Sequence, residues 1–132
     1  MKPRIASAVA LAALLGTSAV NHVRDPKFYY LVVPPVLCTD KGGSLGLMTR
    51  RNWVLASAVP EVLAAVGLLV PGTRRAAAAA TAVMFAGFTA GHVSALRRAF
   101  GPGGTAPARR IHAVRLPLQV PLVVWAWRLR RP

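Results

Sequence analysis

Long apolar runs alternate with short polar stretches along this chain, and each run is long enough to cross a membrane. Three runs are nearly uninterrupted, at residues 5–23, 53–71 and 76–96. A fourth, residues 111–129, is less regular because two prolines, an arginine and a glutamine interrupt it. A membrane-spanning helix needs about 20 apolar residues. The pattern therefore predicts an all-α fold, a four-helix transmembrane bundle.

The first two predicted helices are joined by a long connection, residues 24–52. Its first part, residues 26–37, has three consecutive aromatic residues and then an apolar run that two prolines end. That run is too short to span a membrane, and aromatic side chains concentrate at the level of the lipid headgroups. We expect a partly interfacial or re-entrant segment here, followed by an exposed glycine-rich loop over residues 38–52.

The amino-acid composition and the net charge both bear on the class of protein. Hydrophobic residues make up 55% of the 132 positions and charged residues 15%, whereas an ordinary soluble domain carries about 25% charged residues. The net charge of +14 is typical of nucleic-acid binding, but the basic residues stand at the ends of apolar runs instead of lining one helix face. We predict one membrane domain, residues 1–132, in contact with the lipid bilayer and with no nucleic-acid partner.

Two features allow other interpretations. The single cysteine, Cys38, excludes an intrachain disulfide, and its spacing from the three histidines fits no metal motif, so we predict no metal site. Residues 5–23 also fit a cleaved signal peptide, but the apolar run is long for that role and we favour a membrane helix. The basic residues on the two sides of the predicted bundle give no clear orientation, and we favour both termini in the cytoplasm.

Polar side chains occur within or at the ends of all four predicted helices, where burial in hydrocarbon is costly. Glu61, the only glutamate of the chain, lies near the middle of the second. If neighbouring helices are antiparallel, the polar groups of all four converge in one half of the bundle. The predicted binding pocket consists of Asn21, His22, Ser57, Glu61, His92, Arg115 and Gln119.

We expect Glu61 to form an ion pair with Arg115, because either charge alone would be expensive in the membrane. Two roles for such a pair remain open. It can be purely structural and fix the register of the helices. It can also belong to a proton- or redox-linked pocket, because a histidine beside a carboxylate suits proton transfer near neutral pH. The candidate proton relay is then Glu61, His22 and His92.

Five short motifs follow one another along the chain. They are residues 18–23 (SAVNHV), 26–34 (PKFYYLVVP), 57–62 (SAVPEV), 67–74 (GLLVPGTR) and 115–119 (RLPLQ), the last followed by the WAW of residues 125–127. In this order they resemble the motifs of the DoxX-like family of small four-helix bacterial membrane proteins. His22 and Glu61 are kept, whereas Ala19 and Ala58 replace glycines that the family usually has.

The resemblance implies a protein of the bacterial inner (plasma) membrane that serves as a membrane subunit of an oxidoreductase rather than as a complete enzyme. Members of the family have been linked to quinone-coupled sulfur oxidation and to redox or thiol-stress complexes. We therefore expect a non-covalently bound quinone, a redox-enzyme partner and a homo-oligomer as candidate partners. The alternative is a non-catalytic scaffold that recruits a redox enzyme. A small-solute transporter ranks third, since the chain shows no inverted repeat.

Overall fold

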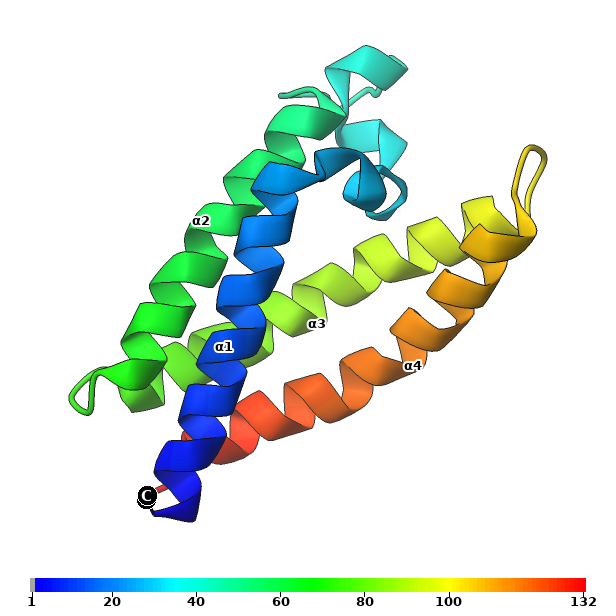
Figure 1. Cartoon of the computed structure of the whole chain (residues 1–132). Helices are drawn as coiled ribbons and strands as arrows, with labels where there is room; N and C mark the ends of the chain where they lie inside the picture. Colours follow the sequence, from blue (N-terminus) through cyan, green and yellow to red (C-terminus); the bar gives the residue numbers. More distant parts are fainter. Residues whose placement is uncertain (1) are drawn as a thin grey trace.

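The structure, a computed structural model, describes residues 2–132, and in this part of the chain helices account for nearly all regular secondary structure, with no β-strand. The four α-helices are α1 (Pro3–Arg24), α2 (Arg50–Leu69), α3 (Arg74–Ala99) and α4 (Ala106–Leu129), labelled in Figure 1. Three short 3-10 helices in the first connection are η1 (Pro26–Val32), η2 (Pro35–Leu37) and η3 (Thr39–Lys41). The predicted all-α fold is confirmed.

Two of the helix starts follow from threonine caps. The hydroxyl of Thr49 accepts a hydrogen bond from the backbone N–H of Asn52 (3.2 Å), and the hydroxyl of Thr105 accepts one from Ala108 (3.3 Å). Such a cap satisfies one of the backbone N–H groups that a helix leaves unpaired at its first turn. Both helices therefore begin several residues before the apolar runs and include the arginines that we predicted to lie just outside them.

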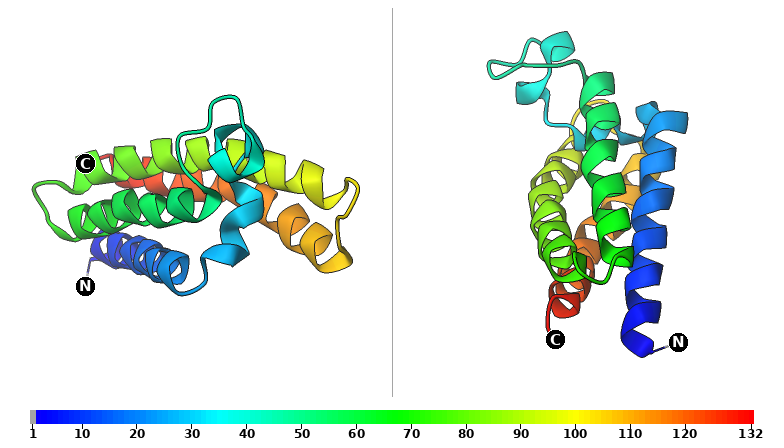
Figure 2. Two further views of the ribbon diagram at one scale, coloured as in Figure 1. Left: turned by 90° about the horizontal axis from the view of Figure 1, so that it is seen from above. Right: turned by 90° about the vertical axis from the view of Figure 1, so that its left-hand side faces the viewer.

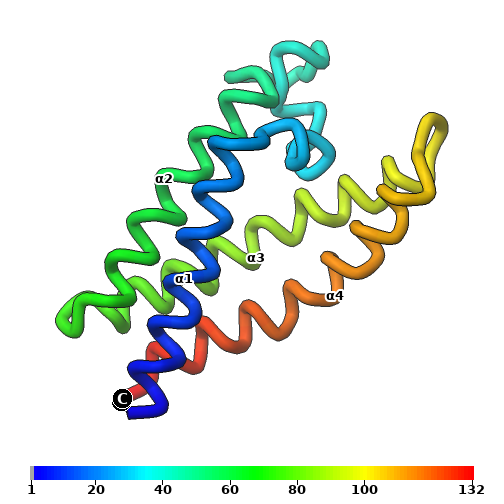
Figure 3. Tube along the Cα trace, viewed as in Figure 1, coloured from blue at the N-terminus to red at the C-terminus, as the bar shows by residue number. Residues whose placement is uncertain are grey.

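The helices form two antiparallel hairpins that diverge toward one end of the molecule. Helix α1 packs mainly on α2, and α3 packs mainly on α4. Figure 1 and the trace in Figure 3 show the hairpins close together at one end and apart at the other. Both chain termini lie at the closed end, and η1 lies between the hairpins at the open end (Figure 2).

The closed end contains the hydrophobic core. Its buried members are Leu11, Ala12, Leu15, Ala64, Ala65, Leu68, Ala78, Ala82, Phe85, Ala126 and Leu129. Two hydrogen bonds join α1 to α4 there: Arg4 donates to the carbonyl of Leu129 (3.1 Å), and the indole N–H of Trp125 donates to the hydroxyl of Ser7 (2.7 Å). The many alanines bring the helix backbones close, which is the usual way that helices pack in membranes.

The distribution of side chains between inside and outside is that of a membrane protein. Large apolar residues such as Leu63 and Val66 on α2 and Val83 on α3 are exposed, whereas Glu61 and His92 are buried. Helices α1, α2 and α3 are long and apolar enough to cross a membrane. Helix α4 is not among the helices that are apolar enough to cross a membrane, so the predicted fourth membrane span is not confirmed.

The first connection is more ordered than predicted. Arg98 of α3 donates hydrogen bonds to the carbonyls of Leu31 and Val33 (3.0 Å for the latter), which fastens the end of η1 to the bundle. The indole N–H of Trp53 donates to the carbonyl of Leu37 (2.6 Å). The segment from residue 26 to 37 thus reaches between the hairpins (Figure 2), and its interfacial or re-entrant character stays a prediction.

The following loop, residues 38–52, is not simply an exposed loop. Cys38 is fully buried and pairs through its backbone with Met48. Asp40 accepts two hydrogen bonds from Arg50, at 3.0 Å from the backbone N–H and 2.9 Å from the guanidinium. These bonds from Arg50 hold the pKa of the Asp40 carboxyl below its ordinary value. Burial raises the pKa of the Cys38 thiol, so the thiol form is favoured at neutral pH.

Replacing Gly91 by alanine should destabilise the protein by about 1–3 kcal/mol, the usual cost of overpacking. A Cβ atom at this position would lie 2.4 Å from the backbone carbonyl oxygen of Val32 in η1. The matched control is Gly87→Ala on the same helix, where a Cβ atom would meet nothing within 4 Å. Thermal unfolding in detergent, followed by circular dichroism, should show a lower Tm for Gly91→Ala only. Equal Tm values for the two variants would contradict the close contact between η1 and α3.

Candidate functional site: a polar pocket between the hairpins

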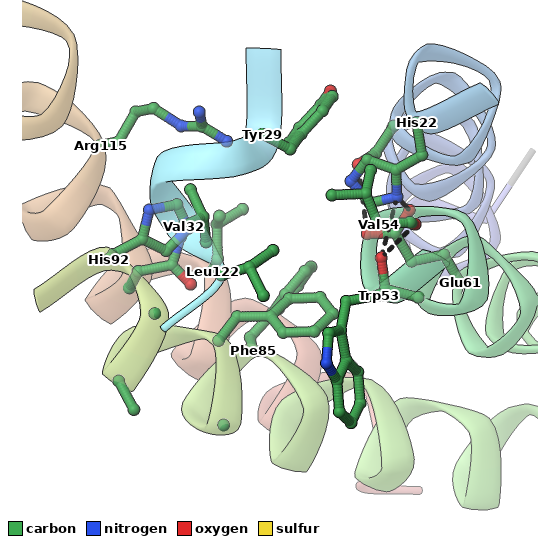
Figure 4. Close-up of a pocket in the computed structure, with 18 of the residues that line it drawn as sticks. His22, Tyr29, Val32, Trp53, Val54, Glu61, Phe85, His92, Arg115 and Leu122 are labelled. Carbon is green, nitrogen blue, oxygen red and sulfur yellow. Dashed lines mark hydrogen bonds and ion pairs between the residues drawn. The ribbon is translucent and has the colours of Figure 1, made fainter. Parts of the chain in front are cut away.

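A cavity of about 450 Å³ lies where the two hairpins diverge. Residues from all four α-helices and from the η1 connection line it, and Figure 4 shows its walls. Most of the lining is apolar and includes Leu15, Phe85 and Leu122, while polar side chains occupy two opposite walls. A mostly apolar cavity of this size with a few converging polar groups is typical of a small-molecule binding site.

The first polar wall is the α1–α2 cluster, which we define as Ser18 and His22 of α1 with Ser57 and Glu61 of α2. The hydroxyl of Ser18 donates to Oε1 of Glu61 (3.2 Å). Nδ1 of His22 lies 3.4 Å from Oε2 of Glu61 and 3.3 Å from the hydroxyl of Ser57. Ser57 and Glu61 are one turn apart and so share a helix face. Their contacts with Ser18 and His22 show that this face of α2 is turned toward α1.

The hydrogen bonds of Ser57 indicate where the imidazole proton lies. The Ser57 hydroxyl donates to the carbonyl of Val54 (2.7 Å), which uses its only proton. We therefore assign the Nδ1–H of His22 as the donor to the Ser57 oxygen. Oε2 of Glu61 is close to the imidazole but has no aligned hydrogen-bond partner in the described part of the chain.

The second polar wall is the α3–α4 cluster, which we define as His92 of α3 with Arg115 and Gln119 of α4. All three side chains line the cavity. The guanidinium of Arg115 lies over the rings of Phe28 and Tyr29, 5.4 Å and 5.5 Å from their centroids. Cation–π contacts of this kind partly compensate a charge that is removed from water.

The predicted ion pair between Glu61 and Arg115 is wrong. Glu61 contacts His22 and Ser18 instead, and Arg115 contacts aromatic rings of η1. The two side chains stand on opposite sides of the cavity in Figure 4, with Tyr29 at its upper edge. The reason is tertiary: α2 and α4 belong to different hairpins, and η1 lies between them at this end.

Four buried polar atoms around the cavity lack hydrogen-bond partners within residues 2–132. They are Oε2 of Glu61, Nδ1 of His92, Nη1 of Arg115 and Oε1 of Gln119. The side chains of Glu61, His92 and Gln119 belong to residues that are 3%, 5% and 7% exposed. More than nine in ten buried polar groups in proteins are paired, so a cluster of exceptions around one cavity requires an explanation. A bound polar ligand would provide one.

Tyr29 closes the cavity on the η1 side. Its ring packs edge-on against the imidazole of His22, with 4.1 Å between the centroids. Burial raises the pKa of the Tyr29 phenol above its ordinary value, so the phenol is neutral at physiological pH and retains its proton as a hydrogen-bond donor.

The structure brings together six of the seven residues that we predicted for the pocket. These are His22, Ser57, Glu61, His92, Arg115 and Gln119. The seventh, Asn21, has an exposed side chain and does not line the cavity, because it points to another face of α1 than its neighbour His22.

Besides the apolar wall, the sequence prediction missed three lining residues that carry polar groups, Ser18, Tyr29 and Trp53. Ser18 could have been found, because it precedes His22 by four positions and so shares its helix face. Tyr29 and Trp53 could not, since both looked like ordinary residues of a membrane interface. In the part of the chain that the structure describes, no group of three or more His, Cys, Asp or Glu side chains could hold a metal ion.

The fold and the cavity define a helical membrane protein with a polar pocket between two helical hairpins. The chain belongs to the family described as a domain of unknown function, DUF8561, whose model matches residues 11–130. No curated protein and no solved structure matches the chain.

Replacing Gln119 by methionine should stabilise the ligand-free protein. The substitution keeps the volume and removes a buried carbonyl oxygen that has no partner, which costs about 1–3 kcal/mol. Tm in detergent should therefore rise. The contrasting variant is Ser18→Ala, which removes a donor from Glu61 and should lower Tm by a similar amount. A lower Tm for Gln119→Met would mean that Gln119 holds the bundle together.

Proposed function

We propose that this chain is a DoxX-like membrane subunit of a redox complex and that its cavity binds a quinone headgroup. One observation carries the proposal: polar atoms from three helices, buried and without partners, surround one cavity of about 450 Å³. A protein that used these groups only for folding would be expected to pair them, because each unpaired group lowers its stability. Natural proteins accept such costs mainly at functional sites.

The residues around the cavity fit a quinone. A quinone headgroup is a flat apolar ring with oxygen atoms that accept hydrogen bonds. Arg115 offers the unpaired donor Nη1, and His92 offers Nδ1 when that nitrogen carries its proton. The rings of Phe85 and Trp53 supply apolar walls for the headgroup. When bound, a quinone would supply electron transfer coupled to proton uptake, which no side chain of this chain provides.

The α1–α2 cluster would handle the proton. Oε2 of Glu61 faces the cavity side of the cluster without a hydrogen bond, so it can hold a proton or release it. His22 lies 3.4 Å from this oxygen and near the end of α1, which makes it a route toward the membrane surface. A carboxyl group next to an imidazole suits proton transfer near neutral pH.

We also propose that α4 crosses the membrane. Its 24 residues would extend about 36 Å at the usual rise, and a bilayer core is about 30 Å thick. Arg115 and Gln119 lower its apolar character, but both face the cavity instead of lipid. With four spans, both termini share one side, which we propose is the cytoplasmic side of the inner membrane.

A second candidate function is a non-catalytic scaffold that recruits a redox enzyme. It is favoured by the contacts of Glu61, which tie α1 to α2 through Ser18 and His22 and would be useful to the fold alone. Purification in mild detergent distinguishes the candidates, since a copurifying soluble partner without quinone favours the scaffold.

Replacing Glu61 by glutamine should weaken binding of the reduced quinone about tenfold, because a hydroxyl of the reduced form would donate to the Glu61 carboxylate and a hydrogen bond to a charged group contributes about 1.5–3 kcal/mol. The measurement is a titration of protein in lipid nanodiscs with short-chain ubiquinone and menaquinone, each in its reduced and in its oxidised form. Trp53 lines the cavity and serves as the fluorescent reporter. The part of the quenching that disappears in Trp53→Phe belongs to the cavity.

The control variant for this titration is Thr81→Val, because Thr81 is buried on α3 outside the cavity and bonds within its own helix. It should bind quinone like the unchanged protein. Saturable quenching that Glu61→Gln leaves unaltered would exclude the chemical role of Glu61. The absence of saturable quenching in the unchanged protein would exclude the quinone site altogether.

A further inference from the structure

Two leucines of the cavity wall also lie on the outer surface of the bundle. Leu14 of α1 is 42% exposed and Leu118 of α4 is 50% exposed, and both line the cavity. In a bundle whose outer surface faces lipid, a side chain that both lines the cavity and is exposed outside lies at an opening between the cavity and the bilayer. The helices that bear these leucines, α1 and α4, belong to different hairpins (Figure 1).

The contacts between α1 and α4 leave this edge open. The two hydrogen bonds that join these helices, Arg4 to Leu129 and Trp125 to Ser7, both lie at the closed end. The core residues that α1 and α4 share also lie toward that end. Farther from that end the two hairpins diverge (Figure 3).

The other approaches to the cavity are partly covered by chain, although Gly87 and Ala90 of α3 also line the cavity and are exposed. Tyr29 of η1 closes the side toward the membrane surface, packed on His22. The edge between α2 and α3 is crossed by residues 33–37, which hydrogen bonds from Arg98 and Trp53 hold in place. A ligand that enters from water would have to displace these anchored segments.

Polarity also changes along the cavity. On α1, His22 and Ser18 are followed toward the closed end by Leu15 and Leu14, and on α4 Arg115 is followed by Leu118, Gln119 and Leu122. The guanidinium of Arg115 and the imidazole of His22 therefore lie toward η1, and leucines flank the opening. An amphiphile would lie with its headgroup among the polar clusters and its tail toward lipid.

We propose that Leu14 and Leu118 frame a lateral portal, through which the cavity takes up a membrane-dissolved quinone that carries a long alkyl or isoprenoid tail. This inference rests on the proposed function for the quinone headgroup. It adds that the quinone carries a long tail and that it enters from the bilayer. The tail remains between α1 and α4, in contact with Leu14, Leu118 and lipid.

The first test is the association rate of a decyl-tailed ubiquinone, delivered from vesicles and followed by quenching of Trp53 in nanodiscs. The double variant Leu14→Phe with Leu118→Phe narrows the portal and should slow association about tenfold, equivalent to 1.4 kcal/mol in the barrier. The matched control is the double variant Leu63→Phe with Val83→Phe, which adds the same bulk at two residues that are each 68% exposed and do not line the cavity. This control should bind at the unchanged rate.

Three outcomes would overturn the portal. Equal slowing in the Leu63→Phe/Val83→Phe control would show that added bulk on the outer surface, and not the portal, sets the rate. An unchanged rate in the leucine-pair variant would exclude a lateral route between α1 and α4. Equal affinity for a tail-free benzoquinone, after correction for membrane partitioning, would exclude the tailed ligand class.

A second measurement tests the portal without any quinone, so that failure of the proposed function can be recognised separately. Phosphatidylcholine brominated near its headgroup quenches tryptophan on contact. Acyl chains that enter through the portal should quench Trp53, and the leucine-pair variant should reduce this quenching relative to the Leu63→Phe/Val83→Phe control. Equal quenching in the two variants would overturn the portal, whether or not quinone binds.

Discussion

A carboxyl group in the middle of an apolar helix can be kept only if the protein itself supplies its partners, because lipid supplies none. Glu61 meets this constraint through one hydrogen bond from Ser18 and close contact with His22. Both partners lie on α1, so the carboxyl group fixes how α1 and α2 pack. The hydrogen bond from Ser18 engages only Oε1 of the carboxyl group, and Oε2 has no hydrogen-bond partner within residues 2–132.

The second constraint is the η1 segment, which keeps the hairpins apart at one end. Arg98 holds its carbonyls, and Gly91 leaves room for its backbone against α3. The bundle is consequently divided into an apolar half, where small residues pack tightly, and a polar half, where a cavity remains. The same division leaves Arg115 over aromatic rings rather than in an ion pair.

The two polar clusters differ in chemistry, and this difference is what makes a redox ligand a reasonable occupant. The α1–α2 cluster contains a carboxyl group 3.4 Å from an imidazole, whereas the α3–α4 cluster contributes the guanidinium of Arg115 and the imidazole of His92 to the cavity wall. A ligand between them would contact a proton source on one side and fixed positive charge on the other. The stability lost to unpaired groups in the free protein would be regained on binding.

The four helices and the half of the bundle where polar groups meet could be predicted from the sequence. These follow from the length of apolar runs and from alternation of helix direction, which are local properties. Six of the cavity residues could be predicted as well, because antiparallel helices bring their polar residues to the same end of the bundle. Which polar side chains contact one another could not be predicted, because tertiary contacts set their partners. Partner choice depends on the separation of the hairpins by η1, and this separation depends on contacts between distant residues such as Arg98 and Leu31.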